Sequence, residues 1–478
     1  MTARIEPRPV IESAARSVAE LVARARVAQK AYARYRQEEL DEVVTAAGWA
    51  IMEPARNRAL AELAVRDTGL GTVKDKIDKN HRKTLGLLRD LAGAVSTGVI
   101  SEDRAKGIVE IARPVGVVAA VVPSTNPGAT PANNVINALK CGNAIILSPS
   151  PKGYTTSAKL LEYLTVELER VGGPRDLVQI LPAPVTKALS SELMRQADLV
   201  VVTGSQANVR AAYSSGTPAL GVGAGNVAVI VDESANLADA AAKIMRSKIF
   251  DNATSCSSET SVIILDAVYE RAVAALGAQG GALLTPPEKS LLEKAMFPGG
   301  HLSSAVTAQS VATICTLAGL ARPELAAAKC LMVEETGTGQ EHPYSGEKLS
   351  PVLTLYRARD FDHAFDIMRA IYDYMGDGHS CGIHTQDDSH IERLGREMTV
   401  CRVIVNQAHA IANGGSFDNG LPFSLTMGCG TWGRNSFSEN LNYRHFMNVT
   451  RIVRPIAPRE PRVEDLFGRY WSKHGIKP

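Results

Sequence analysis

The sequence predicts an α/β fold in which a doubly wound parallel sheet is followed by a second α/β unit. Residues 114–123, Pro-Val-Gly-Val-Val-Ala-Ala-Val-Val-Pro, form a nearly continuous apolar run, typical of a parallel strand covered on both faces. Short apolar runs then alternate with helical periods up to residue 203, which indicates repeated β-α winding. The 478 residues, 45% of them hydrophobic, suggest two or three domains with an ample core.

The overall composition narrows the class of protein. A net charge of +2 demands neither nucleic acid nor a membrane surface as a partner. No apolar run reaches transmembrane length, and residues 1–11 lack the apolar core of a secretory signal. Seven scattered cysteines without a Cys-x-x-Cys motif indicate reduced thiols in the cytoplasm. No group of cysteines and histidines has metal-ligand spacing, so we expect a cytoplasmic protein without a metal site.

Helices are expected before the first strand. Apolar residues recur at helical spacing over residues 10–22, 40–51, 60–65 and 74–92. The charged residues between them are interpreted as a solvated face, and no chemistry is assigned to them. Residues 107–113 instead alternate between polar and apolar, as in a half-exposed strand.

The alternation after residue 123 supplies the rest of the first sheet. Helices are expected over residues 133–141, 155–171 and 185–196, and strands over residues 144–147, 178–181 and 199–203. Loops 124–132 and 148–153 follow strands, and Gly204-Ser205 opens a helix at the edge where ligands bind in such sheets. No Gly-x-Gly-x-x-Gly fingerprint is present, although a helix N-terminus still suits a pyrophosphate. An empty structural turn at Gly204 is the alternative.

A second small-residue loop covers residues 220–226, Leu-Gly-Val-Gly-Ala-Gly-Asn, ahead of a strand over residues 227–231. Glycines let the backbone pass close to another group. We therefore expect this loop to approach a ligand, and a plain tight connection is the alternative.

The second half of the chain continues with helices and strands. Helices are expected over residues 238–249 and 361–374, and strands over residues 261–265, 352–356, 402–405 and 445–453. The stretch from about residue 276 to residue 329 is expected to be looser. The residues after 453 are expected to trail into a polar, proline-rich end.

One cysteine has an unusual setting. Cys256 lies within residues 250–260, Phe-Asp-Asn-Ala-Thr-Ser-Cys-Ser-Ser-Glu-Thr, between a helical run and a strand. A structural cysteine prefers apolar company, whereas a nucleophilic thiolate needs access and nearby N–H donors. We interpret Cys256 as a nucleophile, with a buried cysteine near a helix end as the alternative. The other cysteines are assigned to the core or to loops.

Several segments together resemble the aldehyde dehydrogenase superfamily, and within it the CoA-acylating branch. The resemblance covers residues 107–454, and its motifs fall in the family's order. The motifs are the Cys256 segment, the oxyanion segment Thr125-Asn126-Pro127, and residues 221–226, 347–352 and 427–433.

The resemblance also implies a domain plan and an aldehyde dehydrogenase-like fold. The dinucleotide-binding domain would comprise residues 1–96 and 116–228, and the catalytic domain residues 229–440. Residues 97–115 and 441–478 would form a small oligomerisation β-element and a tail, which implies a homodimer or homotetramer.

Three residues carry catalysis in this interpretation. The Cys256 thiolate adds to an aldehyde, the Asn126 amide holds the oxyanion, and His379 assists deprotonation of the thiol. A satisfied loop histidine is the alternative for His379. After hydride transfer a thioester remains on Cys256. Gly221 stands where hydrolytic relatives carry a glutamate base, and this departure favours release by the thiol of CoA over release by water.

NADP or NAD is the implied cofactor, with coenzyme A as co-substrate. The loop that grips the adenosine ribose has Ser148 and Pro151 where hydrolytic relatives have lysine and glutamate, so it lacks a carboxylate to reject a 2′-phosphate, and Lys152 offers a cation. A carboxylate folded in from elsewhere, such as Asp232, is the alternative. Glu347 would hold the nicotinamide ribose. The implied cofactor-binding residues are Ser124, Thr125, Ser148, Pro149, Ser150, Lys152, Gly204, Ser205, Gly221, Val222, Gly223, Glu347 and Leu349, with Asn226 as a further candidate.

The implied substrate is a short-chain aldehyde. Residues 378–384 and 406–423 most resemble the sulfoacetaldehyde members of the branch, and acetaldehyde-type members are the alternative. An anionic tail needs a cation, and Arg434 and Arg444 are the candidates, each with a plain surface arginine as the alternative. A hydrolytic aldehyde dehydrogenase and a non-catalytic structural homologue are the remaining classes. The intact Cys256 and Asn126 argue against the second.

Overall fold

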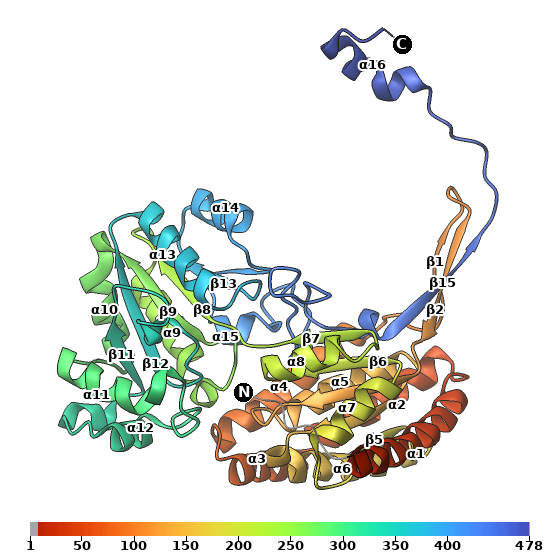
Figure 1. Ribbon diagram of the computed structural model, residues 1–478, viewed down its shortest axis with the longest axis horizontal. Coiled ribbons are helices and arrows are strands. Elements are labelled where there is room, and N and C mark those ends of the chain that lie inside the picture. Colours follow the sequence, from red (N-terminus) through yellow and green to blue (C-terminus); the bar gives the residue numbers. More distant parts are fainter. Residues whose placement is uncertain (1–7, 478) are drawn as a thin grey trace.

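The computed structural model describes residues 8–477 of the chain. Figure 1 shows two α/β bodies side by side, a small sheet that projects from one of them, and a C-terminal helix held away from both. Among the described residues no helix is both long and apolar enough to cross a membrane. Residues 1–7, most of the segment considered above for a secretory signal, lie outside the described residues.

The first body begins with helices, as predicted. They are α1 (Arg8–Tyr32), α2 (Gln37–Met52), α3 (Pro54–Thr68) and α4 (Val73–Leu91). Helix α1 packs against α7 and strands β3 to β5, whereas α2 packs on α5 and α6. The helices therefore add a second layer around the sheet.

A five-stranded parallel sheet in the order β5-β4-β3-β6-β7 forms the centre of the first body, and it confirms the doubly wound fold. Strand β3 is buried at every position, as its apolar run predicts. The order reverses between β3 and β6, so the loops after these strands lie where ligands bind in such sheets. The elements are β3 (Val117–Val122), α5 (Ala129–Lys140), β4 (Ala144–Pro149), α6 (Tyr154–Arg170), β5 (Val178–Ile180), α7 (Lys187–Gln196), β6 (Leu199–Thr203), α8 (Gln206–Tyr213) and β7 (Ala219–Val222).

The second body holds a seven-stranded parallel sheet in the order β10-β11-β12-β9-β8-β13-β14. Its strands are β8 (Val227–Val231), β9 (Glu259–Leu265), β10 (Gly281–Leu283), β11 (Cys330–Glu334), β12 (Val352–Ala358), β13 (Cys381–His384) and β14 (Val403–Val405). Its helices are α9 (Leu237–Ile249), α10 (Tyr269–Ala278), α11 (Pro286–Met296), α12 (Val311–Ala318), α13 (Phe361–Tyr374), α14 (Asp388–Glu397) and α15 (His409–Ala412).

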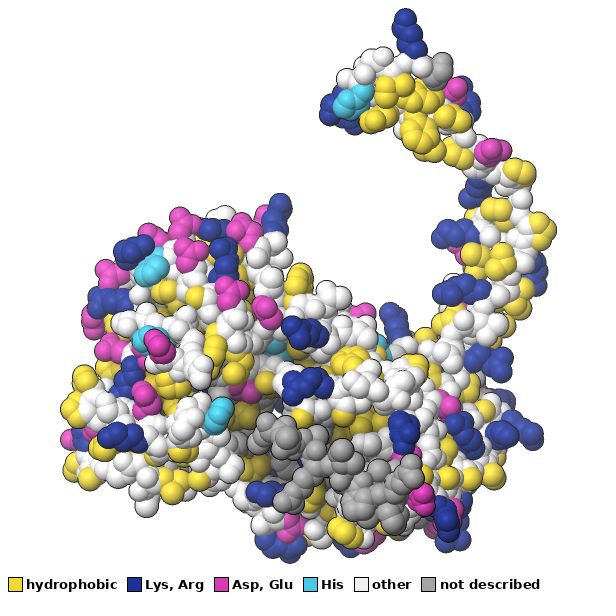
Figure 2. Space-filling model, viewed as in Figure 1, with side chains coloured by type: hydrophobic (Ala, Val, Ile, Leu, Met, Phe, Trp, Pro, Cys, Tyr) yellow, Lys and Arg dark blue, Asp and Glu magenta, His cyan; other side chains and the backbone are white. Residues whose placement is uncertain are grey.

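A third, antiparallel sheet joins β1 (Gly98–Asp103), β2 (Ile108–Pro114) and β15 (Met447–Val453). The chain ends in α16 (Val463–His474), where the sequence had predicted only a polar tail. Figure 2 shows hydrophobic side chains gathered along one side of this helix. Leu466, Phe467 and Tyr470 are among the exposed ones.

Two of the further differences from the predicted elements, the start of α5 and the presence of α11, have one cause. Helix α5 begins at Ala129, within the predicted loop, and α11 and α12 lie in the stretch expected to be looser. Pro131 lies in the first turn of α5, and Pro286 opens α11. Proline is accommodated in the first turn of a helix, where its missing N–H has no helical acceptor. The same residues had been interpreted as loop signals.

The change from the first sheet to the second falls between β7 and β8. Strand β8 belongs to the second sheet from its first residue, Val227. We therefore propose that the domain boundary lies at residues 223–226, slightly before the boundary at residue 228 expected from the sequence. The segment after residue 406 returns to the first core, where Phe423, Phe437 and Phe446 are buried, so it lies across both bodies.

Candidate active site

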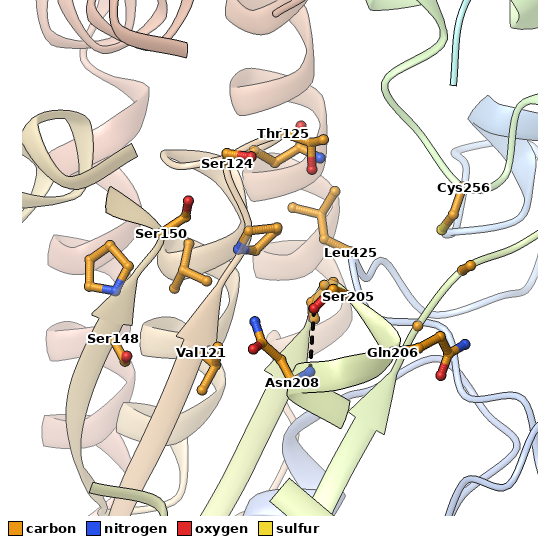
Figure 3. Close-up of a pocket in the computed structure, with 18 of the residues that line it drawn as sticks. Val121, Ser124, Thr125, Ser148, Ser150, Ser205, Gln206, Asn208, Cys256 and Leu425 are labelled. Carbon is orange, nitrogen blue, oxygen red and sulfur yellow. Dashed lines mark hydrogen bonds between the residues drawn. The ribbon is translucent and has the colours of Figure 1, made fainter. Parts of the chain in front are cut away.

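A cavity of about 800 Å³ lies at the carboxyl ends of the first sheet and extends to Cys256. Figure 3 shows Ser124, Thr125, Ser148, Ser150 and Ser205 at these strand ends, with Cys256 across the space from them. Ten of the predicted cofactor-binding residues line the cavity: Ser124, Thr125, Ser148, Pro149, Ser150, Gly204, Ser205, Gly223, Glu347 and Leu349. Its size is typical of a small-molecule site.

The strand-end part of the cavity suits a dinucleotide. The Ser205 hydroxyl accepts a hydrogen bond from the Asn208 N–H at 3.3 Å and so caps α8, as the dashed line in Figure 3 marks. The N-terminus of α8 thus faces the cavity with its partial positive charge. At position 223 a Cβ would lie 2.4 Å from the end of the Gln206 side chain, so a larger residue there would require Gln206 to move. Backbone N–H groups at a helix N-terminus and nearby hydroxyls are the donors that bind a pyrophosphate.

Three predicted cofactor residues do not line the cavity: Lys152, Gly221 and Val222. Residues 220–226 were expected to form a loop, but Gly221 and Val222 belong to strand β7, where they pair with Val202 and Thr203 of β6. Lys152 lies in a short 3₁₀ turn, Pro151–Gly153, and is exposed. The cation that does line this part of the cavity is Lys187, at the start of α7.

Cys256 follows a strained turn. Asp251, Asn252 and Ala253 have φ values of 52°, 51° and 57°, a left-handed conformation that residues with a Cβ adopt at an energetic cost. The turn after it is closed by a hydrogen bond from the Ser258 N–H to the Ser255 carbonyl at 3.0 Å. The thiol lines the cavity instead of packing into an apolar core, and the location supports the nucleophile over the structural alternative.

Two effects keep the Cys256 thiol protonated in the free enzyme. Burial, with a further contribution from Glu347, raises its pKa to about 12. Glu347 is itself buried, and the loss of solvation raises its pKa to about 8 although the Gly225 N–H donates to its Oε1 at 3.2 Å. Among the described residues that line the cavity, Glu347 is the one carboxylate.

The Asn126 side chain is held by Lys79, which is distant from it in sequence. Its Oδ1 accepts a hydrogen bond from the Lys79 ammonium at 2.8 Å. The same ammonium donates to Asp251 Oδ2 at 2.6 Å and to the Thr254 hydroxyl at 3.0 Å. Lys76 completes the cluster with a 3.1 Å bond to Asp251. Because the amide oxygen is occupied, the Asn126 NH₂ group is left to face the cavity that its residue lines.

This cluster corrects the interpretation of α4 as a solvated face. Lys76, Lys79 and Lys83 are 4%, 5% and 5% exposed. They follow one another at i, i+3 and i+7, in phase with buried Leu87, which is the spacing of a buried helix face. This helical spacing was the one sign in the sequence that the three lysines are buried. Lysines are normally interpreted as surface residues unless their partners are known.

His379 lies behind the glycine loop. A Cβ at Gly225 would be 2.4 Å from the Cys256 carbonyl oxygen and 3.1 Å from the His379 ring, so this glycine separates the two. The ring is fully buried outside the cavity lining, and its Nδ1 is 2.8 Å from the Ser380 hydroxyl. Burial lowers its pKa well below 6.5, so the imidazole is neutral. Contact with the thiol stays a prediction.

Four other candidates fall outside the cavity lining. Arg434 and Arg444 are both exposed. The Asn226 amide donates to the Ser345 and Met375 carbonyls, which fits the backbone role considered for it. Asp232 bonds to Thr385 and His390 in the second body, and is not part of the lining near Ser148.

The Cys256 thiol, the Asn126 amide and a dinucleotide-type sheet end thus share one cavity, which is the arrangement expected of a thiol enzyme that works beside a nucleotide cofactor. The chain belongs to the aldehyde dehydrogenase family, whose model matches residues 9–290. This confirms the resemblance found in the motifs.

The relatives are similar along nearly the whole chain. The sulfoacetaldehyde dehydrogenase (acylating) of Cupriavidus necator is 60% identical over 474 residues, which cover 99% of this chain and 96% of that protein. The protein of the same name from Bilophila wadsworthia is 42% identical over 96% of this chain and 100% of its own length. The crystal structure of an acetylating aldehyde dehydrogenase from Geobacillus thermoglucosidasius matches with a TM-score of 0.90 at 34% identity, covering 95% of this chain and 100% of that one.

Proposed function

We propose that the protein is a CoA-acylating aldehyde dehydrogenase that oxidises sulfoacetaldehyde with NADP or NAD and transfers the acyl group to coenzyme A. One observation carries the proposal. The Cys256 thiol and the Asn126 amide share a cavity with the cofactor-type sheet end, and the one carboxylate among the described lining residues, Glu347, has a pKa raised to about 8.

The first half-reaction forms a thioester on the protein. The Cys256 sulfur, once deprotonated, adds to the aldehyde carbon, and the resulting oxyanion accepts hydrogen bonds from the Asn126 NH₂ and a backbone N–H. Lys79 fixes the orientation of that amide in advance, so it need not reorganise during the reaction. A nicotinamide cofactor held at the sheet end would supply the acceptor for the hydride that leaves the carbonyl carbon. Collapse of the oxyanion then leaves the acyl group on Cys256.

The second half-reaction distinguishes a CoA-acylating enzyme from a hydrolytic one. Water needs a general base to attack a thioester, whereas a thiol with a pKa near 8.5 supplies some thiolate near neutrality. Gly221 lies in β7 outside the cavity lining and offers no side chain. Glu347, with a pKa raised to about 8, is mostly protonated at pH 7 and is a poor base. The site therefore favours thiolysis, and the acyl group leaves as a CoA thioester.

The substrate is proposed from the relatives. Two proteins named sulfoacetaldehyde dehydrogenase (acylating) are similar along almost the entire chain. Among the more distant relatives is a protein named succinate-semialdehyde dehydrogenase (acetylating), 39% identical over 91% of this chain. Both kinds of aldehyde carry an acidic group, so we place sulfoacetaldehyde before acetaldehyde.

The setting of the enzyme is part of the same proposal. All seven cysteines are free thiols, which is usual for the reducing cytoplasm. The sheet of β1, β2 and β15 exposes Val99, Ile452 and Val453. An exposed apolar sheet of this kind is commonly covered by another subunit, and this supports a homodimer or homotetramer.

The deciding experiment identifies the product by mass spectrometry, with and without CoA, over a panel of aldehydes. We expect sulfoacetyl-CoA when CoA is present. Without CoA, reduced cofactor should appear in a burst no larger than the enzyme concentration, because the acyl-enzyme accumulates. Steady release of free sulfoacetate without CoA would establish the hydrolytic alternative, and no cofactor reduction with any aldehyde would establish the non-catalytic one.

A further inference from the structure

A lysine lines the cavity without a carboxylate partner. Lys83 on α4 is 5% exposed, and its residue belongs to the same cavity lining as Cys256. Its ammonium donates a hydrogen bond to the Gly414 carbonyl at 2.5 Å and lies 5.5 Å from the centre of the Phe423 ring. Within residues 8–477, no carboxylate oxygen comes within the 4.0 Å of an ion pair with Lys83.

Its neighbours on the helix are satisfied differently. Lys76 and Lys79 both pair with Asp251, at 3.1 and 2.6 Å. Lys83 lies one turn further on and has no such partner. A buried cation without a counter-charge is costly, and burial together with Arg82 and Lys79 lowers the pKa of Lys83 well below 10.5, opposed by Asp90. An anion that enters the cavity would remove this cost.

We propose that Lys83 binds the anionic end of the substrate, a sulfonate on the carbon next to the aldehyde, and so selects acidic aldehydes over neutral ones. This inference rests on the proposed function. Lys79 and Lys83 are separated by one turn, about 6 Å along the helix axis. In the proposed binding mode the aldehyde oxygen lies at the Asn126 amide, which Lys79 holds, and the second carbon extends toward Lys83.

A second connection links Lys83 to the residue that follows the nucleophile. Gly414, which accepts its hydrogen bond, follows Asn413 in the chain, and the Asn413 amide donates to the Ser257 hydroxyl at 2.9 Å. Ser257 is the residue after Cys256. The other cation in the cavity lining, Lys187, lies on α7 near the strand-end serines. The two cations thus serve different ends of the cavity.

The test compares charged and neutral aldehydes in the intact enzyme. For Lys83→Met, kcat/KM for sulfoacetaldehyde with saturating CoA should fall about 50-fold or more, because a charge-assisted contact is lost. The value for propionaldehyde should stay within about threefold, because no charged contact is lost with that substrate. Lys83→Arg should recover part of the preference for sulfoacetaldehyde. Arg444→Met, which removes an exposed positive charge, should change neither substrate.

An unreactive anion provides a second measurement on the wild-type enzyme. Ethanesulfonate should slow alkylation of Cys256 by iodoacetamide, whereas propionamide at the same concentration should not. Absence of this protection, an unchanged substrate preference in Lys83→Met, or an equal loss for both aldehydes would each overturn the role of Lys83. If wild-type enzyme instead makes no sulfoacetyl-CoA while Lys83→Met loses protection by ethanesulfonate, the anion site stands and the proposed substrate is wrong.

Discussion

The Lys79 ammonium donates a hydrogen bond to Asn126 Oδ1 at 2.8 Å. The bond decides which end of the amide meets the substrate, because an oxygen that accepts from lysine leaves the NH₂ group as the free donor. Asp251 keeps Lys79 in place at 2.6 Å, and Asp251 lies in the strained turn just before Cys256. The proposed oxyanion donor, Asn126, and the proposed nucleophile, Cys256, are therefore positioned by one buried ion cluster.

The first prediction tests this cluster through Lys79→Met. Loss of the bond leaves the Asn126 amide free to rotate, and we expect the hydride step in single turnovers to slow by roughly 10-fold or more, against roughly 100-fold for Asn126→Ala. Cofactor affinity should change little. The double variant should be no slower than Asn126→Ala alone, because Lys79 acts through that amide.

The matched control is Lys74→Met, which removes an exposed lysine from the same helix. It should leave the hydride step unchanged. If the effects of Lys79→Met and Asn126→Ala multiplied in the double variant, Lys79 would act on the reaction by a separate route.

A second prediction concerns the nucleophile. Cys256→Ala should abolish aldehyde oxidation and acyl-CoA reduction, because the acyl group then has no sulfur to bind. Binding of the nicotinamide cofactor, measured by fluorescence titration, should persist. Cys401→Ala, a half-buried thiol outside the cavity lining, is the control and should keep full activity. Turnover above about a hundredth of wild type in Cys256→Ala would assign the chemistry to another group.

These residues differ in how far the sequence predicts them. Cys256 and Asn126 lie in local segments whose composition and motif are visible in the chain. The parallel sheet can also be predicted from a local segment, because β3 is apolar at each of its six positions. The burial of Lys79 depends on Asp251, 172 residues away, and no local pattern of charges reports such a partner.

Tertiary packing also explains the misplaced elements. Gly221 and Val222 were expected in a loop because glycines mark loops, but their backbone groups belong to the β6–β7 ladder. Arg434 and Arg444 were considered as anion ligands because arginine suits a sulfonate, and both are exposed. Tertiary packing determines which cation of a chain reaches a cavity. Lys83 was not predicted as a ligand because its helix, α4, contains no motif.

A third prediction follows from the pKa values in the free enzyme. Because the pKa of the Cys256 thiol is raised to about 12, its alkylation by iodoacetamide should be slow at pH 7 and accelerate up to pH 10. Glu347, with a pKa raised to about 8, is charged only above that pH, and its charge then opposes the thiolate. Glu347→Gln should therefore speed alkylation severalfold at pH 9.5 and leave it nearly unchanged at pH 6.5.

The wild-type enzyme is measured at both pH values as the reference. The variant Cys401→Ala, measured in the same way, is the control that excludes a contribution from the other partly exposed thiol. Equal alkylation rates for Glu347→Gln and wild type at pH 9.5 would mean that the carboxylate does not act on the sulfur.

The last prediction concerns the choice between NADP and NAD. A 2′-phosphate brings about two negative charges near neutral pH, and the strand-end part of the cavity offers serine hydroxyls and Lys187. The one carboxylate in the described lining, Glu347, hydrogen-bonds the Gly225 N–H near Cys256. We therefore expect NADP to be accepted at least comparably with NAD.

Lys187→Met should lower kcat/KM for NADP more than for NAD, and Pro151→Glu should shift the preference toward NAD by adding a repelling charge. Lys152→Met, which removes an exposed cation outside the lining, is the matched control and should affect both cofactors equally. Strict use of NAD by the wild type, with no response to Pro151→Glu, would place the adenosine ribose elsewhere.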